Sequence, residues 1–535
     1  MNHPAHALLA TLALLTLCGP GCSDDDDPGA DPGVTADAGA DSPNNGADTD
    51  ADEPELGEDG FPVDTPAWGV AWEEVWYEEG ETCIFSSARA VDLDGDGVQE
   101  LIQGHGKENL RAGAFDGSFE PFGYMTVRDS STGAQLGRVD ARDELVGSPT
   151  LIDLTGDGVE DFVIGGRNAE LMAVSGSDYS LLWRFYPDGG AREDGWYNFY
   201  TPQAVGDLNE DGVPDLLAAN GGDATKPPGD PDRPPGHLML ISGADGAVIA
   251  SSVVPGGGET YMSPIVYRPT PEAPLHALFG TGGETLPGSL WRVAVSDLAD
   301  GDLSAAEELI APTDAGKGLI APPSLGDLNG DGALDIVVPV FDGRLVALDG
   351  ESGQVLWSHS YPGQESIATP ALGHFDDNPG LDVAALFLSG TFPTYRGSVH
   401  LIVRGDTGEV VFEEELPEIR GAVSPLAVDL TGDGRDEVLW GVVSGRGQLM
   451  IAVLDLANQP RLRRAWVTTG FTVSTPIVGD FDGDGALELI VSTNLPRTEY
   501  TWGMTRLDLK ASTPARISWG AYLGTNADGS YALDD

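Results

Sequence analysis

Basic residues are scarce in this chain of 535 residues, which has 27 Lys and Arg against 87 Asp and Glu. The formal net charge of −60 excludes nucleic acid and anionic membrane surfaces as partners, because both are bound through basic patches. Cations are the expected counterparts instead. Long apolar runs are also lacking, since the run at residues 7–17 is too short to cross a bilayer.

Cysteine is limited to three residues, and the N-terminal run explains one of them. An apolar stretch such as residues 7–17 is typical of a secretory signal peptide. The Gly-Cys pair that follows is similar to the end of bacterial lipoprotein signals, so we expect residues 1–22 to be such a signal and Cys22 to be lipidated. Ordinary secretion is the alternative. Once Cys18 is removed with the signal, Cys83 is the only other thiol, and no intrachain disulfide can stabilise the fold.

The next segment, residues 23–64, is rich in Asp, Pro, Gly and Ala and has no Lys or Arg. Such a composition cannot offset the chain entropy of folding, so we expect a disordered acidic linker that holds a domain away from the membrane. A short lead-in segment, residues 65–84, is expected to pack on that domain. Its Trp68, Trp72 and Trp76 recur at a spacing of four, which predicts a short helix.

The remaining chain, residues 85–535, is built on a repeated acidic motif. Six complete copies and one degraded copy begin at Asp92, Asp153, Asp207, Asp327, Asp429, Asp480 and, degraded, His374. Their spacing of about 50 to 60 residues indicates a repeat architecture, and the interval from 207 to 327 is about two periods long. One copy is therefore missing from the acidic series.

A second pattern fills that interval. Ser-Pro, Thr-Pro or Pro-Pro precedes six of the copies, and Ser263-Pro264 lies inside the gap, followed by a unit that keeps the apolar pattern without the acids. Each unit contains short apolar stretches separated by Gly and Asp, which predict β-strands. Eight units of four strands are typical of an all-β fold of the β-propeller type. We predict eight blades, with seven as the alternative.

The acidic motif begins like an EF-hand loop, but its twelfth position lacks the bidentate Glu that an EF-hand requires. The last acid stands at position nine instead, as in Glu100 and Asp161. Side chains at positions one, three and five can converge on one centre, the Gly at six permits a sharp turn, and the carbonyl at seven and the acid at nine complete an oxygen shell. Such ligands favour Ca2+ over zinc or copper, and over the smaller shell of Mg2+.

These units resemble the FG-GAP/VCBS repeats of integrin-type α-subunit propellers and of bacterial proteins. The resemblance implies a calcium loop between the first two strands of a blade, and hence about six Ca2+ sites. The implied ligands are Asp92, Asp94, Asp96, Val98 and Glu100; Asp153, Thr155, Asp157, Val159 and Asp161; Asp207, Asn209, Asp211, Val213 and Asp215; Asp327, Asn329, Asp331, Ala333 and Asp335; Asp429, Thr431, Asp433, Arg435 and Glu437; and Asp480, Asp482, Asp484, Ala486 and Glu488.

The loops with Thr or Asn at position three carry less charge and are expected to bind more weakly, and the copy at His374 is expected to bind little or no metal. Sites with a Kd of about 10⁻⁴ M would each contribute about 1.4 kcal/mol at about 1 mM Ca2+, or about 8 kcal/mol for six. The alternative is that the loops are acidic β-turns without metal, which Asp and Gly also favour.

Catalysis is not expected, because the sequence has no GxSxG, HExxH or P-loop motif and its His residues are scattered among the units. Two unit endings, residues 347–357 and 401–411, resemble those of quinoprotein dehydrogenase propellers, which also have eight blades. A quinoprotein-type enzyme is therefore the alternative function. The Arg404-Gly405-Asp406 tripeptide stands where the preceding unit has a hairpin turn, and we interpret it as a turn and not as an adhesion motif.

The resemblance further implies that ligands bind opposite the calcium loops, on the segments that lead into each blade. Those segments contain Trp196, Tyr197, Tyr200 and Tyr261, and exposed aromatic residues are common recognition groups, although alternate residues of "WYNFY" could equally lie in the core. We expect a calcium-binding protein of the bacterial cell envelope, anchored at the outer membrane or cell surface only through lipid, that acts in adhesion or recognition of a protein or glycan. A passive surface-coat protein is the third hypothesis.

Overall fold

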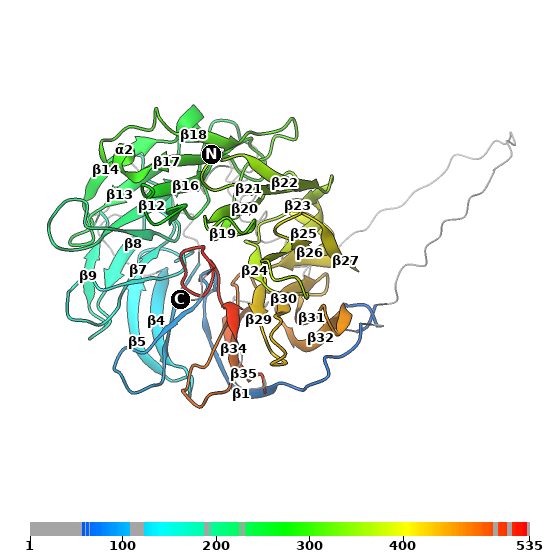
Figure 1. Cartoon of the computed structure of the whole chain (residues 1–535). Coiled ribbons are helices and arrows are strands. Elements are labelled where there is room, and N and C mark those ends of the chain that lie inside the picture. The colour runs from blue at the N-terminus through cyan, green and yellow to red at the C-terminus, as the bar shows by residue number, and fades with distance from the viewer. Residues whose placement is uncertain are drawn as a thin grey trace, which may run out of the picture.

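The computed structural model describes residues 56–58, 60–63, 65–107, 122–186, 191, 194–223, 226, 230–495, 501–510 and 516–531. They form a ring of eight antiparallel sheets, which confirms the prediction of an all-β propeller with eight blades (Figure 1). The predicted signal peptide, Cys22 and most of the linker lie outside the described residues. In the part of the chain that the structure describes, no helix is long and apolar enough to cross a membrane.

The first four blades follow one another along the chain. Blade 1 consists of β2 (Arg89–Val91), β3 (Glu100–Gly106), β4 (Gly123–Asp129) and β5 (Gln135–Ala141), and blade 2 of β6 (Thr150–Ile152), β7 (Asp161–Gly165), β8 (Leu171–Val174) and β9 (Leu181–Arg184). Blade 3 has β10 (Asn198–Phe199) and β11 (Gln203–Gly206) on β12 (Asp215–Gly221), then β13 (His237–Ile241), β14 (Val248–Val253) and a 3-10 turn, η1 (Pro255–Gly257). Blade 4, the unit without an acidic motif, comprises β15 (Ile265–Tyr267), β16 (His276–Gly280), β17 (Leu290–Ala294), the short helix α2 (Val295–Ala299) and β18 (Glu307–Ile310).

The other four blades complete the ring. Blade 5 consists of β19 (Ser324–Gly326), β20 (Asp335–Pro339), β21 (Arg344–Leu348) and β22 (Val355–Ser360). Blade 6 has β23 (Gln364–Glu365) and β24 (Ala371–Gly373) on β25 (Asp382–Thr391), then β26 (Thr394–Arg404) and β27 (Val410–Pro417). Blade 7 has β28 (Ile419–Ala422) and β29 (Leu426–Val428) on β30 (Glu437–Ser444), then β31 (Gln448–Asp455) and β32 (Gln459–Thr469). Blade 8 takes β33 (Ile477–Gly479), β34 (Glu488–Leu495) and β35 (Thr501–Asp508) from this end of the chain.

The strands in the middle of a blade are buried on both faces because the neighbouring blades pack against them. β7 and β8 are buried at every residue, whereas the outer strand β5 exposes most of its side chains. Between blades 1 and 2, for example, Ile102 and Met125 meet Phe162 and Ile164 in one apolar cluster. Burial of apolar surface between successive blades is thus the main source of stability, as in other radial repeats.

Blade 8 is completed by the lead-in segment. β1 (Glu73–Glu81) pairs antiparallel with β35 over eight residue pairs and forms the outer strand of the blade. The predicted helix over the tryptophans is therefore wrong. The five Glu residues of β1 belong to an outer edge strand, where charged side chains face water and discourage pairing with other chains.

The three tryptophans pack on the rim of the ring, as expected. Trp68 and Trp72 cover the apolar cluster of blades 7 and 8, and the Trp76 indole Nε1 donates a hydrogen bond to the carbonyl of Ser130 in blade 1 (2.8 Å). The described end of the predicted linker is also packed. Phe61 is fully buried in the cluster of blades 5 to 7, and Arg446 donates to the carbonyl of Gly57 (2.7 Å).

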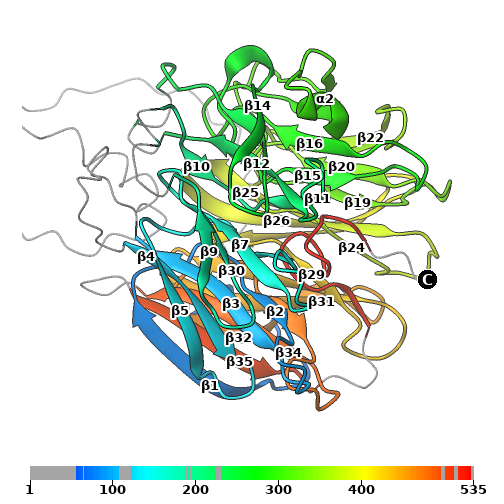
Figure 2. The same ribbon diagram turned by 90° about the vertical axis from the view of Figure 1, so that its left-hand side faces the viewer.

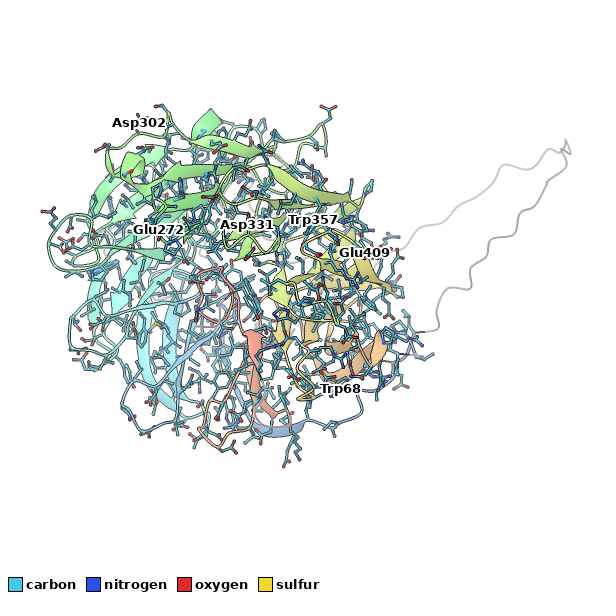
Figure 3. The ribbon with its side chains drawn as sticks, viewed as in Figure 1. Trp68, Glu272, Asp302, Asp331, Trp357 and Glu409 are labelled. Carbon is cyan, nitrogen blue, oxygen red and sulfur yellow. The ribbon has the colours of Figure 1, made fainter. Side chains whose placement is uncertain are left out.

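The innermost strands of the blades run in the same direction, so each acidic loop follows at the same face of the ring. We name this the acidic face, and the other the opposite face; Figure 2 shows the ring turned by 90°. In Figure 3 Asp331 of the fifth unit lies toward the middle of the ring and Trp68 lies at its edge. The segments with Ser-Pro or Thr-Pro precede the innermost strands and therefore lie at the opposite face.

The C-terminal segment, residues 516–531, lies in the middle of the ring (Figure 1). Its strand β36 (Ile517–Trp519) pairs antiparallel with β29 and thus runs inward from the acidic face. Beyond Tyr522 the chain turns back, and backbone bonds from Leu325 to Gly529 and from Tyr531 to Leu325 (2.7 Å each) hold its last described residues against β19. The segment therefore fills the centre of the ring, and we name residues 516–531 the plug.

Candidate functional site

The acidic loops share one backbone scaffold. In all six, the carboxylate at position one accepts the N–H of the Gly at position six, as Asp92 does from Gly97 (3.1 Å). The residue at position seven donates its N–H to the carboxylate at position five, as Val98 does to Asp96 (2.8 Å). Gly97 has a φ of 90°, which a residue with a side chain adopts only with strain. Asp and Gly at these positions are thus explained by the turn itself.

The acid at position nine braces the loop. Its side chain is buried in all six loops and accepts the N–H of the residue at position two, as Glu100 does from Leu93 (2.8 Å). Asp382 in the degraded copy makes the same contact with Phe375 (3.1 Å). Because the brace persists where no metal was expected, an acid at position nine does not by itself indicate a metal site.

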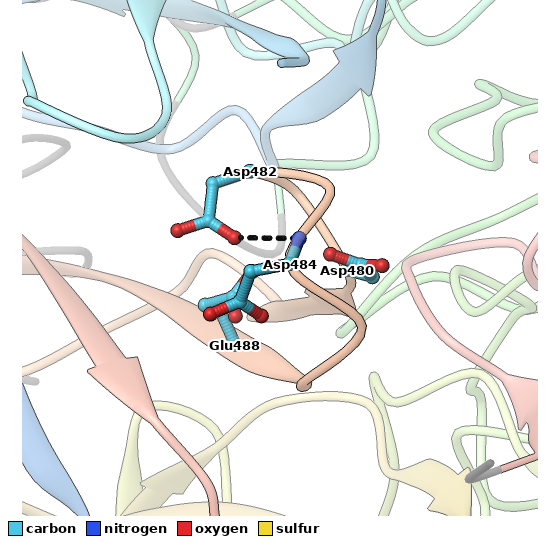
Figure 4. Close-up of side chains that lie close together, drawn as sticks. All are labelled: Asp480, Asp482, Asp484 and Glu488. Atoms are coloured by element: carbon cyan, nitrogen blue, oxygen red, sulfur yellow. Dashed lines mark hydrogen bonds between the residues drawn. The ribbon is translucent and has the colours of Figure 1, made fainter. Parts of the chain in front are cut away.

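Within the described residues, three or more acidic side chains come within ligand distance of one another in two groups only, each in one loop. One group is Asp480, Asp482, Asp484 and Glu488, which surround a single turn (Figure 4), and the other is Asp92, Asp94 and Asp96. These are the two loops with Asp at position three. In the other four intact loops Thr or Asn stands there, and the predicted ligands do not bring three carboxylates together.

The loop at 480–488 has two unsatisfied oxygens. Asp480 Oδ1 and Glu488 Oε1 are buried and have no hydrogen-bond partner, and burial raises the pKa of Glu488 to about 7. Arg506 supplies part of the missing charge, with its Nη2 lying 2.6 Å from Asp482 and 3.5 Å from Glu488. A set of carboxylate oxygens with two members that accept no hydrogen bond fits Ca2+, which takes six to eight oxygen ligands. These residues could therefore hold the ion that the sequence predicts.

Addition of about 1 mM Ca2+ to protein treated with EGTA is expected to raise the midpoint of thermal unfolding. Two sites with a Kd of about 10⁻⁴ M would add about 3 kcal/mol to the free energy of unfolding. Asp480→Asn should remove about half of the effect, because Asn keeps the bond from Gly485 but loses the charge. Differential scanning calorimetry measures the shift in the unfolding midpoint, with Mg2+ as the ionic control.

The matched control is Asp153→Asn, which changes position one of a loop where three carboxylates do not meet. Its calcium response should equal that of the unsubstituted chain. Equal losses in both variants, or identical melts in EGTA and Ca2+, would contradict a specific site at 480–488.

Arginine side chains take the place of a cation around the degraded copy. The Arg404 guanidinium bonds to Asp376 (2.8 Å) and Glu409 (2.6 Å), and Arg435 of the next loop pairs with Asp377 (2.7 Å). Arg404 ends β26, and the RGD tripeptide forms part of the hairpin to β27, which confirms the interpretation as a turn. Because Arg404 is engaged within the fold, this tripeptide does not present a free arginine.

Replacement of the buried Asp382 with Asn is expected to alter the pH dependence of stability. Burial raises the pKa of Asp382 to about 7, from about 3.8 when unfolded, so its stabilising contribution is complete below pH 3.8 and is lost as the pH rises through 7. Relative to the parent chain, Asp382→Asn should gain about 3 to 4 kcal/mol between pH 4 and pH 8. Urea unfolding in EGTA measures the difference. The exposed turn variant Asp245→Asn should show no such trend; a parallel trend in the two variants would contradict the assignment.

Hydrogen bonds around the axis join residues of the Ser-Pro and Thr-Pro signals, together with Ser87 at the equivalent position of blade 1. The hydroxyl of one blade accepts the N–H of the equivalent residue in the preceding blade, in the pairs Thr475 to Ser87 (2.9 Å), Ser87 to Ser148 (3.1 Å), Ser148 to Thr201 (2.9 Å), Thr201 to Ser263 (3.3 Å) and Thr369 to Ser424 (3.0 Å). At blade 5 the equivalent residue is Pro322, which has neither a hydroxyl nor an N–H, and the series is interrupted there. Among the hydrogen bonds of the described residues, none joins Ser424 of blade 7 to Thr475 of blade 8. Apart from Ser87, these residues had a sequence signal, but the signal did not reveal their role.

A cavity of about 390 Å³ lies on the axis at the opposite face, and we name it the axial pocket. Blades 2 to 4 supply a polar wall with Arg167, Tyr200, Asp223, Arg233, Tyr261 and Glu284. The later blades supply an apolar wall with Ile367, Leu388, Phe392, Val423, Val443 and Phe471. Tyr522 of the plug also lines it, with its hydroxyl 3.3 Å from Ser263 Oγ. Its size and mixed lining are typical of a small-ligand site.

Two of the four predicted ligand-face aromatics line this pocket. The rings of Tyr200 and Tyr261 meet edge to face at 6.2 Å, and burial raises the pKa of both hydroxyls, which keeps them neutral. Tyr261 fits only because Gly222 has no side chain, since a Cβ there would lie 2.4 Å from the ring. The other two aromatics lie outside the lining: Trp196 packs against Phe185 and His237, and the Tyr197 N–H bonds to Asn220.

The sheet order and the acidic loops define the class of the protein as an eight-bladed β-propeller. Residues 429–491, which span the acidic loop of blade 7 and the start of blade 8, match the family of FG-GAP-like repeats. The chain is thus a propeller that contains an FG-GAP-like repeat, as the resemblance implied. No curated protein matches the sequence significantly.

Several solved structures share the fold. The quinohemoprotein alcohol dehydrogenase of Comamonas testosteroni aligns over 83% of this chain and 77% of its own, with a TM-score of 0.55 and 11% identity. The quinohemoprotein alcohol dehydrogenase ADHIIG of Pseudomonas putida HK5 aligns over 85% of this chain and 79% of its own, with a TM-score of 0.52 and 12% identity. At such identities the likeness establishes the propeller fold alone.

Proposed function

We propose that this chain is a binding protein of the bacterial cell envelope that recognises a protein or glycan ligand in the axial pocket. The observation that carries the proposal is the position of Tyr200 and Tyr261, which were expected to face a ligand and which line a cavity on the face opposite the acidic loops. Neutral tyrosines combine apolar area with a hydrogen-bond donor and are common at recognition sites.

In this proposal calcium has a structural role. The acidic loops and the axial pocket lie on different faces, so ions bound at 92–96 and 480–488 would stiffen the turns between innermost and second strands without touching the ligand. The support for an envelope location is the N-terminal sequence, in which a lipid on Cys22 and the acidic linker would hold the propeller at a distance from the membrane. Adhesion is the role that this arrangement serves best.

A quinoprotein-type enzyme is the alternative, and its support is the shared fold. It predicts a bound quinone absorbance in the purified protein and dye-coupled oxidation of alcohols, which a binding protein does not give. A passive coat protein predicts the absence of any saturable ligand. We propose binding without catalysis because the pocket aromatics offer recognition groups.

The double substitution Tyr200→Ala/Tyr261→Ala is expected to weaken binding at least about tenfold, because aromatic anchors at recognition sites contribute about 2 kcal/mol or more. Arrays of bacterial and host-type glycans and of peptides would supply the ligand, and titration of the best binder would give Kd. Tyr197→Ala is the matched control, since it removes the same side chain from the same segment outside the pocket.

Unchanged affinity of the double variant for a saturable ligand would contradict the axial pocket as the binding site. Turnover with a bound quinone would replace the proposal with the enzymatic alternative. Thermal melts of each variant show whether a loss of affinity reflects a loss of folding.

A further inference from the structure

A buried positive charge lies near the axial pocket without a counter-charge. Arg89, at the start of the innermost strand of blade 1, is 4% exposed, and all three nitrogens of its guanidinium are buried without a hydrogen-bond partner. Burial lowers its pKa to about 10, so it stays charged at neutral pH. An unpaired buried charge is costly, and no acidic residue in the described part of the chain forms an ion pair with this one.

The location of Arg89 connects it with the pocket. β2 runs inward from the opposite face, and Ser87, two residues before Arg89, lines the pocket. Tyr522 also lines it, and the positive charge of Arg89 partly opposes the rise that burial causes in the pKa of the Tyr522 hydroxyl. Arg89 is therefore not part of the lining itself but lies behind it, within electrostatic range of Tyr522, whose hydroxyl bonds to that of Ser263.

The other basic side chains of the polar wall already have acidic partners. Arg167 pairs with Glu144 (2.6 Å) and Arg233 with Glu259 (3.4 Å). Arg420, which lines the pocket beside the apolar wall, makes no ion pair or side-chain hydrogen bond with the residues described. The arginines at or beside the pocket that lack an acidic partner among the described residues are Arg420 and Arg89, so the part of the pocket next to Tyr522 favours an anion. The negative charge of Glu284 lies on the polar wall, near Tyr261.

We propose that the axial pocket binds a carboxylate carried on an apolar group, such as the C-terminal end of a peptide with an apolar last residue. The carboxylate would lie above Arg89 and accept hydrogen bonds from Tyr522 and Ser263, while the apolar group would lie against Leu388, Phe392 and Phe471. This inference rests on the proposed function and specifies its ligand. The apolar wall favours such a chain end over a glycan.

The buried position of Arg89 makes its charge effective. Few water molecules screen a charge at this depth, so its attraction for a carboxylate is stronger than that of a surface arginine. A hydrogen bond or ion pair that involves a charged group favours the charged ligand by about ten- to a hundredfold in affinity over a neutral one. The expected signature is thus a preference for the acid over the matched amide.

The test compares two pairs of probes by calorimetric titration. The first pair is N-acetyl-Gly-Leu as the free acid and as the C-terminal amide, and the second pair is octanoate and octanol. The relative affinities of the two acids distinguish a peptide end from a fatty acid as the preferred ligand. The unsubstituted chain should bind the acids at least about tenfold more tightly than their neutral partners. Arg89→Met should abolish this preference, and Arg89→Lys should retain part of it.

Arg138→Met is the matched control, because Arg138 is an exposed arginine paired with Asp140 (2.9 Å) and its loss changes the net charge equally. It should leave the preference intact. Equal binding of acid and amide by the unsubstituted chain would overturn the inference while leaving the pocket as a ligand site. A preference that survives Arg89→Met but is lost in Arg420→Met would overturn the role of Arg89.

A loss of folding is not expected to account for a change in the affinity of the Arg89 variants. Replacement of an unpaired buried charge by a side chain of similar volume is expected to leave the melting temperature unchanged or raise it. A large loss of stability in Arg89→Met, together with an unchanged ratio of acid to amide affinity in Arg89→Gln, would assign Arg89 a structural role and overturn the inference.

Discussion

A chain that begins at residue 82 is expected to lose at least about 5 kcal/mol of the free energy of unfolding, which is of the order of the whole net stability of a domain. It lacks β1, so blade 8 keeps three strands and β35 loses eight residue pairs. The side of Trp502 that Gly80 covers would be exposed, since the two lie in direct contact. Ring closure between the first and last blades would then depend on the inner strands alone.

The comparison is with a chain that begins at residue 55, which retains the packed segment around Phe61 and β1. Thermal unfolding and limited proteolysis of the two chains measure the difference. A synthetic peptide of residues 65–84 should restore stability to the shorter chain when it is added, because the missing strand pairs through its backbone. Equal melting temperatures of the two chains would contradict the role of β1 in closing the ring.

The number of blades could be predicted because every unit carries its own signal. The acidic motif marked six units, the degraded copy at His374 a seventh, and Ser263-Pro264 the eighth. The contribution of β1 could not be predicted in this way, because a closing strand stands outside the repeat. Its five Glu and the tryptophans at a spacing of four favour a helix locally, and only the pairing with β35 decides for a strand.

The acidic loops show where a sequence pattern has two physical causes. Asp at positions one and five and Gly at six bind backbone N–H groups or permit the turn, and the acid at nine braces it, so most of the motif is explained without metal. The residue at position three distinguishes the loops with a possible metal site from the others. Among the six intact loops, three carboxylates converge only in the two where this residue is Asp94 or Asp482. Convergence also depends on side-chain direction, which the sequence alone does not specify.

The axial pocket was predicted in part. Tyr200 and Tyr261 were assigned to the ligand face because they precede innermost strands, and both line the pocket. Trp196 belongs to the same sequence segment but packs against Phe185. Regular alternation would put residues 196 and 200 on the same side, and Trp196 departs from it because it precedes the short strand β10. Arg89 had no sequence signal at all, because its lack of a partner becomes visible only when the eight blades and the plug are assembled.

Removal of the plug is expected to have a similarly large effect. A chain that ends at residue 510 loses Trp519 and Leu523, both fully buried, which lie in two different inter-blade clusters. Truncation of one buried Trp to Ala costs about 3 to 5 kcal/mol, so loss of the segment should cost at least about 5 kcal/mol. Denaturant unfolding against a chain that ends at residue 531 measures this cost.

Hydrogen exchange gives a second readout that reports on the pocket. The Leu325 amide donates to Gly529 in the plug, so it should lose protection in the chain that ends at 510, together with the amides of β29 that face β36. Ligands should also lose affinity, because Tyr522 would no longer line the axial pocket. Retained affinity with lost stability would place the ligand entirely on the blades and would assign the plug a purely structural role. Retained stability would contradict the packing of the segment in the ring.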